Sequence, residues 1–552
     1  MSNHNVACLL SARVQQNPEG RALVYQDGGI DRVMSLGQLE QRCDSYAQGL
    51  RTLGLRPGDK VLLMEPPGPR FVALSFALFK LGCVPVLIDP GMGVGSLLRC
   101  VERLRPDILV GVGRIHLLRS FQPSHFASVR RAVCTDGHWP GARSLEASCD
   151  PKAAAVSPHG CSSDQLAAIL FTSGSTGPAK GVEYRHGVFA AQVEALQHMF
   201  QFEPGQVDMP GFPLFALFSV ALGLTCVLPD LQPSRPASAE PTRLIRSILD
   251  WQVNNLQGSP AIWEKLGRYC LDYGIELPSV RRVITFGAPI SLKFLETWNK
   301  LLAGRGEVYT PYGATEVLPI SLISGQEVLG DTAAGTRAGK GTCVGRAVPG
   351  VQVRILKVYD RPLPEWQEDE FLPPGEVGEI VVSAEQVTWA YHQDAAATEA
   401  SKIRQGERIW HRMGDLGYLD EVGRLWIVGR KNHRVEGAEQ TYYPACAEGI
   451  ADEHPDVRRS ALVAVPDPER AEGRIPALVV ELLRPRHYKD SGERNRISRE
   501  LRERLAQHPP YGDVQQVFFH KDFPVDPRHN VKIDREALGL WARSQGRSRK
   551  TP

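Results

Sequence analysis

A segment rich in glycine, hydroxyl and lysine side chains is the part of this sequence best equipped for chemistry. It runs from Thr172 to Gly181 (TSGSTGPAKG), directly after the apolar run 166–171. Glycines let backbone N–H groups wrap around an anion, and a lysine adds a point charge for phosphate. The spacing is not the Walker pattern, because Gly181 follows Lys180 where that pattern needs Ser or Thr. These residues indicate a phosphate-binding loop, with a flexible Ser/Gly linker as the alternative, and leave the nucleotide open.

Alternating apolar runs and amphipathic stretches surround this segment and predict an α/β fold. Strand–helix–strand repetition favours parallel sheets covered by helices. Expected strands lie at 60–64, 84–88, 107–112 and 166–171, with a helix at 71–81. Apolar runs at 376–383 and 424–428 predict a β-rich piece. The pattern of apolar and charged residues changes at Gly429, after which shorter strands and helices are expected. The basic last ten residues, 543–552, are expected to fray.

The size and charge of the chain limit its function class. Its 552 residues exceed the roughly 250–300 that one hydrophobic core supports, so we expect two or more domains with a ligand groove between them. The 64 Lys and Arg against 62 Asp and Glu give a net charge of +2, which argues against a nucleic-acid binder. Eleven cysteines without a C-x-x-C pair, and a start without a signal-peptide pattern, favour a cytoplasmic protein.

One uncharged stretch imitates a membrane span. Met209 to Pro229 covers 21 residues, long enough to cross a bilayer. Prolines and glycines interrupt it, and Asp208 and Asp230 flank it without a Lys or Arg to set an orientation. We therefore expect no membrane span but a buried helix running into a buried strand.

Four more segments resemble motifs of the acyl-adenylate-forming superfamily, which includes acyl-CoA ligases, luciferases and peptide-synthetase adenylation domains. They are Tyr312–Glu316 (YGATE), Gly414-Asp415 with Met413 in place of a threonine, Gly429-Arg430, and 523–535 around Lys532. With the loop at 172–181 they follow the family order and spacing, and the resemblance covers about residues 6 to 541. It implies a large N-terminal domain of stacked βα sheets plus a β-rich subdomain (1–428), which holds ATP and the acyl substrate. A small mobile α+β C-terminal domain (429–552) would carry the catalytic lysine.

The resemblance also implies a role for each matched residue. Contacts to the β- and γ-phosphates of ATP are expected from Thr172, Ser173, Gly174, Ser175, Thr176, Gly177 and Lys180. Contacts to adenine and ribose are expected from Gly287, Ala288, Pro289, Tyr312, Gly313, Asp415 and Arg430. Thr315 would touch the α-phosphate, Glu316 and Thr176 would help hold Mg²⁺, and Lys532 would reach the reacting carboxylate. Attack of a carboxylate on the α-phosphorus brings two anions together, so cations must offset their repulsion. The expected catalytic residues are the cations Lys532 and Lys180, and Glu316, which would hold the Mg²⁺ ion.

The loop after Gly429 bears on the second step of the reaction. Most relatives transfer the acyl group to a thiol, and a glycine in this loop lets the thiol arm pass. Glu439 stands at that position here, and Asn432 and His433 replace the usual Lys-Asp hinge pair. A bulky acid would narrow and charge a thiol tunnel, whereas a shift of one or two residues would bring Gly437 there.

Longer segments, such as 310–320 (TPYGATEVLPI) and 429–436 (GRKNHRVE), resemble the olefin β-lactone synthetase branch, as does Ala216 in place of a usual histidine. That branch adenylates a 2-alkyl-3-hydroxy fatty acid, whose 3-hydroxyl then expels AMP and closes a β-lactone. Alternatives are a fatty acyl-CoA ligase, a ligase that loads a carrier-protein thiol, and a non-catalytic nucleotide-binding protein. Relatives of the branch work beside a thiolase, a reductase and a decarboxylase, so a complex with such hydrocarbon-pathway enzymes is an open alternative.

Overall fold

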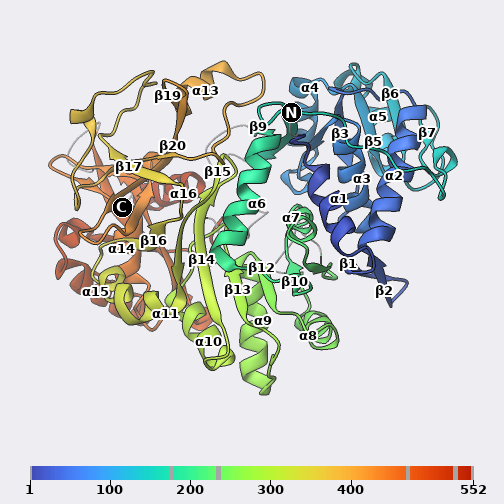
Figure 1. The fold of residues 1–552 in the computed structure, drawn as a ribbon. Coiled ribbons are helices and arrows are strands. Elements are labelled where there is room, and N and C mark those ends of the chain that lie inside the picture. Colours follow the sequence, from blue (N-terminus) through green and yellow to red (C-terminus); the bar gives the residue numbers. More distant parts are fainter. Residues whose placement is uncertain (1–2, 173–178, 232–237, 468–472, 526–532, 549–552) are drawn as a thin grey trace.

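A computed structural model describes residues 3–172, 179–231, 238–467, 473–525 and 533–548 of the chain. Within them the strands form two large sheets, a small three-stranded sheet and a short hairpin. Figure 1 shows the first large sheet among the blue helices, most of the second from green to orange, with two dark-blue strands at its end, and helix α6 (His186–Phe200) between the two sheets.

The first sheet has seven strands in the order β7-β6-β5-β3-β4-β8-β9. Its strands are β3 (Lys60–Met64), β4 (Val84–Leu87), β5 (Ile108–Gly111), β6 (Arg131–Cys134), β7 (Arg143–Ser144), β8 (Leu166–Thr172) and β9 (Lys180–Arg185). All neighbours are parallel except β8 and β9. Because strand side chains alternate between faces, Val61 and Leu63 pack with one core and Leu62 with another.

Helices cover both faces of this sheet. The first core includes residues of α1 (Ala7–Gln16), α2 (Leu36–Thr52), α3 (Pro69–Lys80) and α6. The second core includes residues of α4 (Val94–Leu104), and α5 (Gly113–Phe121) adds Ile115 to it. The predicted helix at 71–81 and the parallel arrangement of the predicted strands are both present.

The second sheet has fourteen strands in the order β17-β18-β20-β21-β16-β15-β14-β13-β12-β10-β11-β1-β2, with β19 beside β20. Its first part comprises β1 (Arg21–Asp27), β2 (Ile30–Ser35), β10 (Val207–Pro210), β11 (Thr225–Val227), β12 (Asn255–Gly258), β13 (Arg282–Thr285) and β14 (Glu307–Ala314). Its second part comprises β15 (Val317–Ser324), β16 (Thr342–Ala347), β17 (Gln352–Leu356), β18 (Gly378–Ser383), β19 (Lys402–Gln405), β20 (Arg408–Leu419) and β21 (Leu425–Arg430). From β14 onward the pairings of the second part are antiparallel, which accounts for the β-rich piece.

The helices that follow α6 in the chain lie mostly against this second sheet. They are α7 (Phe215–Ala221), α8 (Pro241–Asp250), α9 (Pro260–Tyr273), α10 (Leu292–Leu302), α11 (Gly325–Glu327), α12 (Ala333–Arg337) and α13 (Ala395–Ser401). The core that α8, α9 and α10 build against it contains the buried Trp263 and Trp298.

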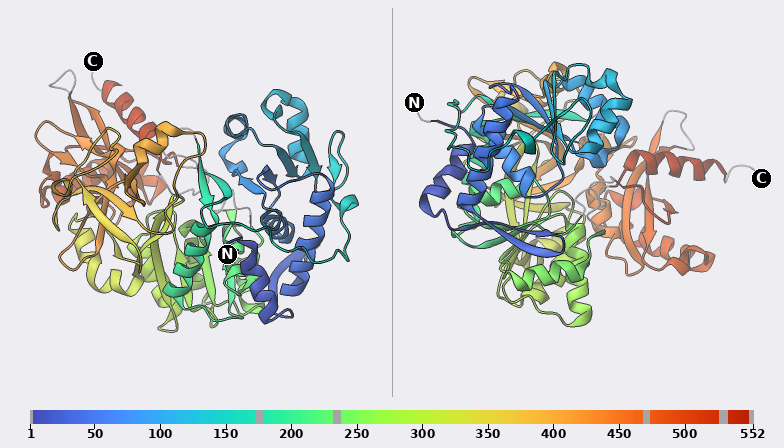
Figure 2. Two further views of the ribbon diagram at one scale, coloured as in Figure 1. Left: turned by 45° about the horizontal axis from the view of Figure 1, so that its top comes forward. Right: turned by 90° about the vertical axis from the view of Figure 1, so that its right-hand side faces the viewer.

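A smaller α+β unit follows the second sheet and projects to one side of it (Figure 2). It contains the hairpin β22 (Val435–Glu436) and β23 (Thr441–Tyr442), and then α14 (Pro444–Ala451), β24 (Val457–Pro466), β25 (Arg474–Leu482), α15 (Ser491–Ala506), β26 (Gln516–Phe519) and α16 (Arg535–Ser548). Leu462 and Val480 face one core of its sheet, and Ala461 and Val479 face the other. The α/β class with a large N-terminal and a smaller C-terminal domain is thereby confirmed.

The uncharged stretch 209–229 forms the end of β10, then α7 and β11, and among the described residues no helix is long and apolar enough to cross a membrane. The expected fraying of 543–552 was wrong for its first part, because α16 continues to Ser548. Leu538 and Ala542 are buried on the inner side of α16, and the Trp541 ring packs on the His520 ring with centroids 4.5 Å apart, so side-chain packing holds the helix in place.

Candidate active site

Three of the sequence-predicted residues meet where β14 approaches β20 and β21. The Tyr312 hydroxyl donates a hydrogen bond to Asp415 Oδ2 at 2.6 Å, and Arg430 Nε lies 3.1 Å from Asp415 Oδ1. Asp415 and Arg430 are cross-strand partners on β20 and β21, so the sheet register itself brings them together. Burial, and then the Asp415 carboxylate, raise the pKa of Tyr312, which keeps its hydroxyl protonated and donating. The Asp415 carboxylate raises the pKa of Arg430 in turn.

Glu316 lies in the turn between β14 and β15, and a residue that the sequence analysis missed holds its side chain. The Tyr391 hydroxyl donates to Glu316 Oε1 at 2.6 Å. Burial, and then the Glu316 carboxylate, raise the pKa of Tyr391. Lys180 Nζ lies 4.9 Å from the centroid of the Tyr391 ring, a cation–π contact, so one tyrosine joins the expected metal ligand to the expected phosphate-binding lysine.

A buried lysine lies behind Glu316. Lys402 is only 6% exposed, and its Nζ donates to Thr388 Oγ1 at 3.2 Å. Thr388 binds the Glu316 carbonyl oxygen through both its N–H (2.9 Å) and its Oγ1 (3.0 Å). Burial lowers the pKa of Lys402 to about 7, and the Glu316 charge opposes this shift. No pattern in the sequence marks Thr388, Tyr391 or Lys402, because each lies 72 or more positions from Glu316.

The expected phosphate loop joins β8 to β9. Thr172 and Lys180 are cross-strand partners, so the two ends of this connection are held side by side. The remaining loop residues named above, Ser173 to Gly177, lie outside the described residues, as does Lys532. The structure therefore places Lys180 in the site and describes nothing of the others' side chains.

The expected adenine segment follows the carboxyl end of β13, whose parallel neighbour β14 leads to Tyr312. Ligands bind at such strand ends in parallel sheets. Gly287 has φ +90°, a backbone conformation that favours glycine, and Ala288 and Pro289 continue the loop. At Gly313 a Cβ would lie 2.9 Å from Leu318 Cβ, so this glycine permits the tight approach of β14 and β15.

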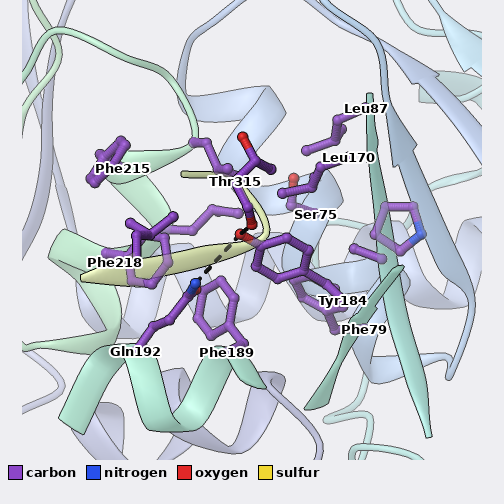
Figure 3. A pocket seen from close by; sticks show the side chains of 15 residues that line it. Ser75, Phe79, Leu87, Leu170, Tyr184, Phe189, Gln192, Phe215, Phe218 and Thr315 are labelled. Carbon is purple, nitrogen blue, oxygen red and sulfur yellow. Dashed lines mark hydrogen bonds between the residues drawn. The ribbon is translucent and has the colours of Figure 1, made fainter. Parts of the chain in front are cut away.

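An apolar cavity of about 110 Å³ opens beside Thr315 (Figure 3). Its walls come from α3, β4, β8, α6 and α7, and include Phe79, Leu170, Phe189 and Phe218. The rings of Phe189 and Phe218 are stacked with centroids 4.5 Å apart. The Thr315 carbonyl accepts a hydrogen bond from the Tyr184 hydroxyl at 2.6 Å, which gives this largely apolar space a polar end; Ser75 and Gln192 are the other polar side chains of its wall.

Glu316 suits a magnesium ion chemically. Mg²⁺ prefers carboxylate oxygens, together with water and substrate phosphates. Tyr391 occupies one lone pair of Glu316 Oε1, and an ionised carboxylate offers about four such positions. The carboxylate therefore has capacity for both the tyrosine and a cation.

The chain is similar to known proteins over most of its length. Residues 10–392 match the model of the AMP-binding enzyme family. The chain is 40% identical over 555 residues to the olefin beta-lactone synthetase of Xanthomonas campestris, covering 98% of each chain. It is 41% identical over 525 residues to the olefin beta-lactone synthetase of Stenotrophomonas maltophilia, covering 93% of this chain and 92% of that one.

Solved structures of more distant sequence share the fold. An amide bond synthetase from Marinactinospora thermotolerans matches with a TM-score of 0.78 and 23% identity, covering 97% of this chain and 99% of that one. The o-succinylbenzoate coenzyme A synthetase of Bacillus subtilis, solved with ATP and magnesium, matches with a TM-score of 0.74 and 22% identity, covering 96% and 98%. The family match and the full-length relatives together show that this chain belongs to the AMP-binding enzymes and is an adenylate-forming ligase.

Proposed function

We propose that this enzyme is a β-lactone synthetase. It would adenylate a 2-alkyl-3-hydroxy fatty acid with ATP, and the substrate's own 3-hydroxyl would then attack the activated carbonyl, giving a β-lactone, AMP and pyrophosphate. The observation that carries this proposal is the 40% identity to a synthetase of that name over 98% of both chains.

The site residues support the adenylation step in named roles. Arg430 and Tyr312 occupy part of the Asp415 carboxylate, which has further lone pairs to offer to the ribose hydroxyls. Lys180 supplies positive charge at the end of the phosphate loop, and Lys532 would add it from the C-terminal domain. Glu316, with Thr176, would hold Mg²⁺, which supplies further positive charge against the phosphates when bound. These cations reduce the repulsion between the carboxylate and the α-phosphate.

The cavity beside Thr315 supports an alkyl-bearing acid. Its aromatic and aliphatic walls favour an alkyl chain by about 0.8 kcal/mol per buried methylene. Because the cavity ends at Thr315, an acid whose chain fills it presents its carboxylate beside the residues proposed to bind the α-phosphate. We propose that this cavity receives the substrate next to its carboxyl group.

The hinge loop supports an intramolecular second step. Glu439 is exposed near the tip of the β22–β23 hairpin. A Cβ at Gly437 would lie 2.8 Å from Tyr442 Cε2, so packing within the hairpin already explains that glycine. Gly437 therefore gives no reason to shift the alignment of this loop by two residues, and Glu439 stays at the position where thiol ligases have a glycine. The 3-hydroxyl is instead held in the same molecule as the carbonyl, and its high effective concentration helps to offset ring strain.

The decisive experiment supplies ATP, Mg²⁺ and a 2-alkyl-3-hydroxy acid without CoA. Pyrophosphate, AMP and the lactone are then measured by coupled assay and mass spectrometry. We expect all three products in equal amounts. Release of AMP without lactone, together with thioester formation when CoA or a carrier protein is added, would instead support a thiol ligase. Lys532→Ala is expected to abolish pyrophosphate release while ATP binding persists, which also separates catalysis from nucleotide binding alone.

We also propose that residues 1–428 and 429–552 move as separate units of a cytoplasmic enzyme. At the boundary Arg430 Nε lies 3.1 Å from Asp415 Oδ1, and beyond it few ion pairs join the two units among the described residues: Lys431 Nζ lies 3.3 Å from Glu379 Oε2, Arg337 Nε lies 3.0 Å from Glu453 Oε2, and Arg434 Nη2 lies 2.7 Å from Asp360 Oδ2. The last two pairs are partly exposed, and exposed ion pairs contribute little, so they permit a rotation that withdraws Lys532 after adenylation. Association with hydrocarbon-pathway enzymes is a further proposal, testable by co-purification.

A further inference from the structure

One hydrogen-bond acceptor in the wall of the apolar cavity has no partner. Gln192 lies on α6, is fully buried and lines the cavity. Its Nε2 donates to the Tyr184 hydroxyl oxygen at 3.4 Å, as the dashed line in Figure 3 shows. Its Oε1 is buried and, among the described residues, is without any hydrogen-bond partner. Buried polar atoms are rarely left unpaired in proteins, so this atom calls for an explanation.

The direction of the neighbouring hydrogen bonds determines which end of the Gln192 amide is unpaired. The Thr315 carbonyl oxygen can only accept, so the Tyr184 hydroxyl must donate its single proton there, at 2.6 Å. The Tyr184 oxygen can then only accept from Gln192, which assigns Nε2 to the tyrosine and Oε1 to the unpaired position. Burial raises the pKa of Tyr184, so its hydroxyl keeps this proton.

The missing donor can come from a molecule that occupies the cavity. Among the lining residues, Phe189, Phe218 and Leu214 carry no side-chain donor, and the Ser75 hydroxyl donates to the Phe71 carbonyl oxygen at 2.8 Å. The chain of hydrogen bonds from Thr315 through Tyr184 places the Gln192 amide two hydrogen bonds from the turn proposed to meet the α-phosphate. A 3-hydroxy acid carries its hydroxyl two carbons from the carboxyl carbon, within reach of this amide when the carboxyl group lies at Thr315.

We propose that Gln192 Oε1 accepts a hydrogen bond from the 3-hydroxyl group of the acid, and thereby selects hydroxylated acids and orients the nucleophile. This inference rests on the proposed function. The hydroxyl directs its proton to Gln192 and leaves its oxygen lone pairs to face the activated carbonyl. In the second step the hydroxyl oxygen forms a bond to the carbonyl carbon, the bond from that carbon to AMP breaks, AMP leaves as its anion, and the hydroxyl proton passes to solvent. An amide is not a base, so Gln192 binds and orients the hydroxyl without removing its proton.

The test compares a 2-alkyl-3-hydroxy acid with the same acid lacking the hydroxyl, using pyrophosphate release as the readout. Wild-type enzyme is expected to prefer the hydroxy acid in kcat/KM by at least about tenfold, because an acid without the donor leaves the acceptor unpaired. Gln192→Leu should lower kcat/KM for the hydroxy acid by about 10- to 100-fold and change that for the deoxy acid less than about twofold. Gln197→Leu is the matched control, because it removes an amide from the same helix, where Nε2 donates to the Phe202 carbonyl at 2.9 Å outside the cavity, and should leave the hydroxyl preference unchanged.

Equal losses for both acids in Gln192→Leu, or a hydroxyl preference that survives the substitution, would overturn the inference, as would a wild-type enzyme without preference. Gln192→Met, which keeps the side-chain length, replaces the leucine variant if that variant does not fold. The outcomes also separate this inference from the proposed function. Hydroxyl selection without lactone formation refutes the function and keeps Gln192, whereas lactone formation without a role for Gln192 refutes only the inference.

Discussion

Tyr391 offers a sharp test of how the site is held together. Tyr391→Phe removes the hydroxyl that donates to Glu316 Oε1 at 2.6 Å but keeps the ring that lies 4.9 Å from Lys180 Nζ. The substitution thus isolates one charge-assisted hydrogen bond. Such bonds contribute about 1.5–3 kcal/mol, and each 1.4 kcal/mol is about tenfold in rate. If the bond orients Glu316 for adenylation, kcat/KM should fall by about 10- to 150-fold.

The assay is pyrophosphate release measured against both the acid and Mg²⁺. Because Tyr391 acts through Glu316, the variant should need more Mg²⁺ for half-maximal rate, a shift that a general loss of stability would not produce. Tyr488→Phe is a matched control in the C-terminal domain, where the hydroxyl donates to the His520 carbonyl at 3.0 Å. It should alter the melting temperature without changing the Mg²⁺ requirement. A Tyr391→Phe enzyme with kcat/KM within twofold of wild type would refute the reasoning.

Three further substitutions test buried charge, nucleotide binding and backbone conformation. The pKa of Lys402 is about 7 in the folded protein against 10.5 ordinarily, so the unfolded chain binds more protons between these values and stability falls as the pH drops from 10.5 to 7. Lys402→Met should therefore stabilise the protein most below pH 7, by about 5 kcal/mol at most, in urea titrations; an unchanged pH dependence of stability would contradict the lowered pKa of Lys402. Asp415→Ala should raise KM for ATP by about 10- to 100-fold, and an unchanged KM would remove Asp415 from the nucleotide site. Gly345→Ala should cost at least about 3 kcal/mol in thermal unfolding, because Gly345 has φ +82° and its Cβ would lie 1.9 Å from the Leu322 carbonyl oxygen; an unchanged melting temperature would contradict the β15–β16 pairing.

Local sequence patterns predicted the parts of the site that are contiguous in the chain. The strand before the expected phosphate loop was predicted to end at Phe171 and ends at Thr172, and β3 occupies its predicted residues, because short apolar runs indicate burial directly. The residues around Glu316 were not predictable in this way. Tyr391 and Lys402 belong to the segment before β19 and to β19 itself, and only the packing of that segment against β9 and β20 brings them to Glu316. Long-range placement of this kind leaves no periodicity in one sequence.

Helix α6 explains how the two large sheets can present one site. Phe189, near the start of the helix, meets Phe79 of α3 with centroids 6.4 Å apart, and Phe200, at its end, meets Tyr309 of β14 at 5.3 Å. The helix thus packs both on the helical layer of the sheet that carries Lys180 and on the strand that leads to Tyr312 (Figure 1). Close-packed aromatic contacts resist displacement, so the expected phosphate side and the expected adenine side of the site should keep a fixed separation. Because Gln192 lies on the same helix between these contacts, the same packing positions the cavity wall, and the motion proposed above would be confined to the C-terminal domain that would deliver Lys532.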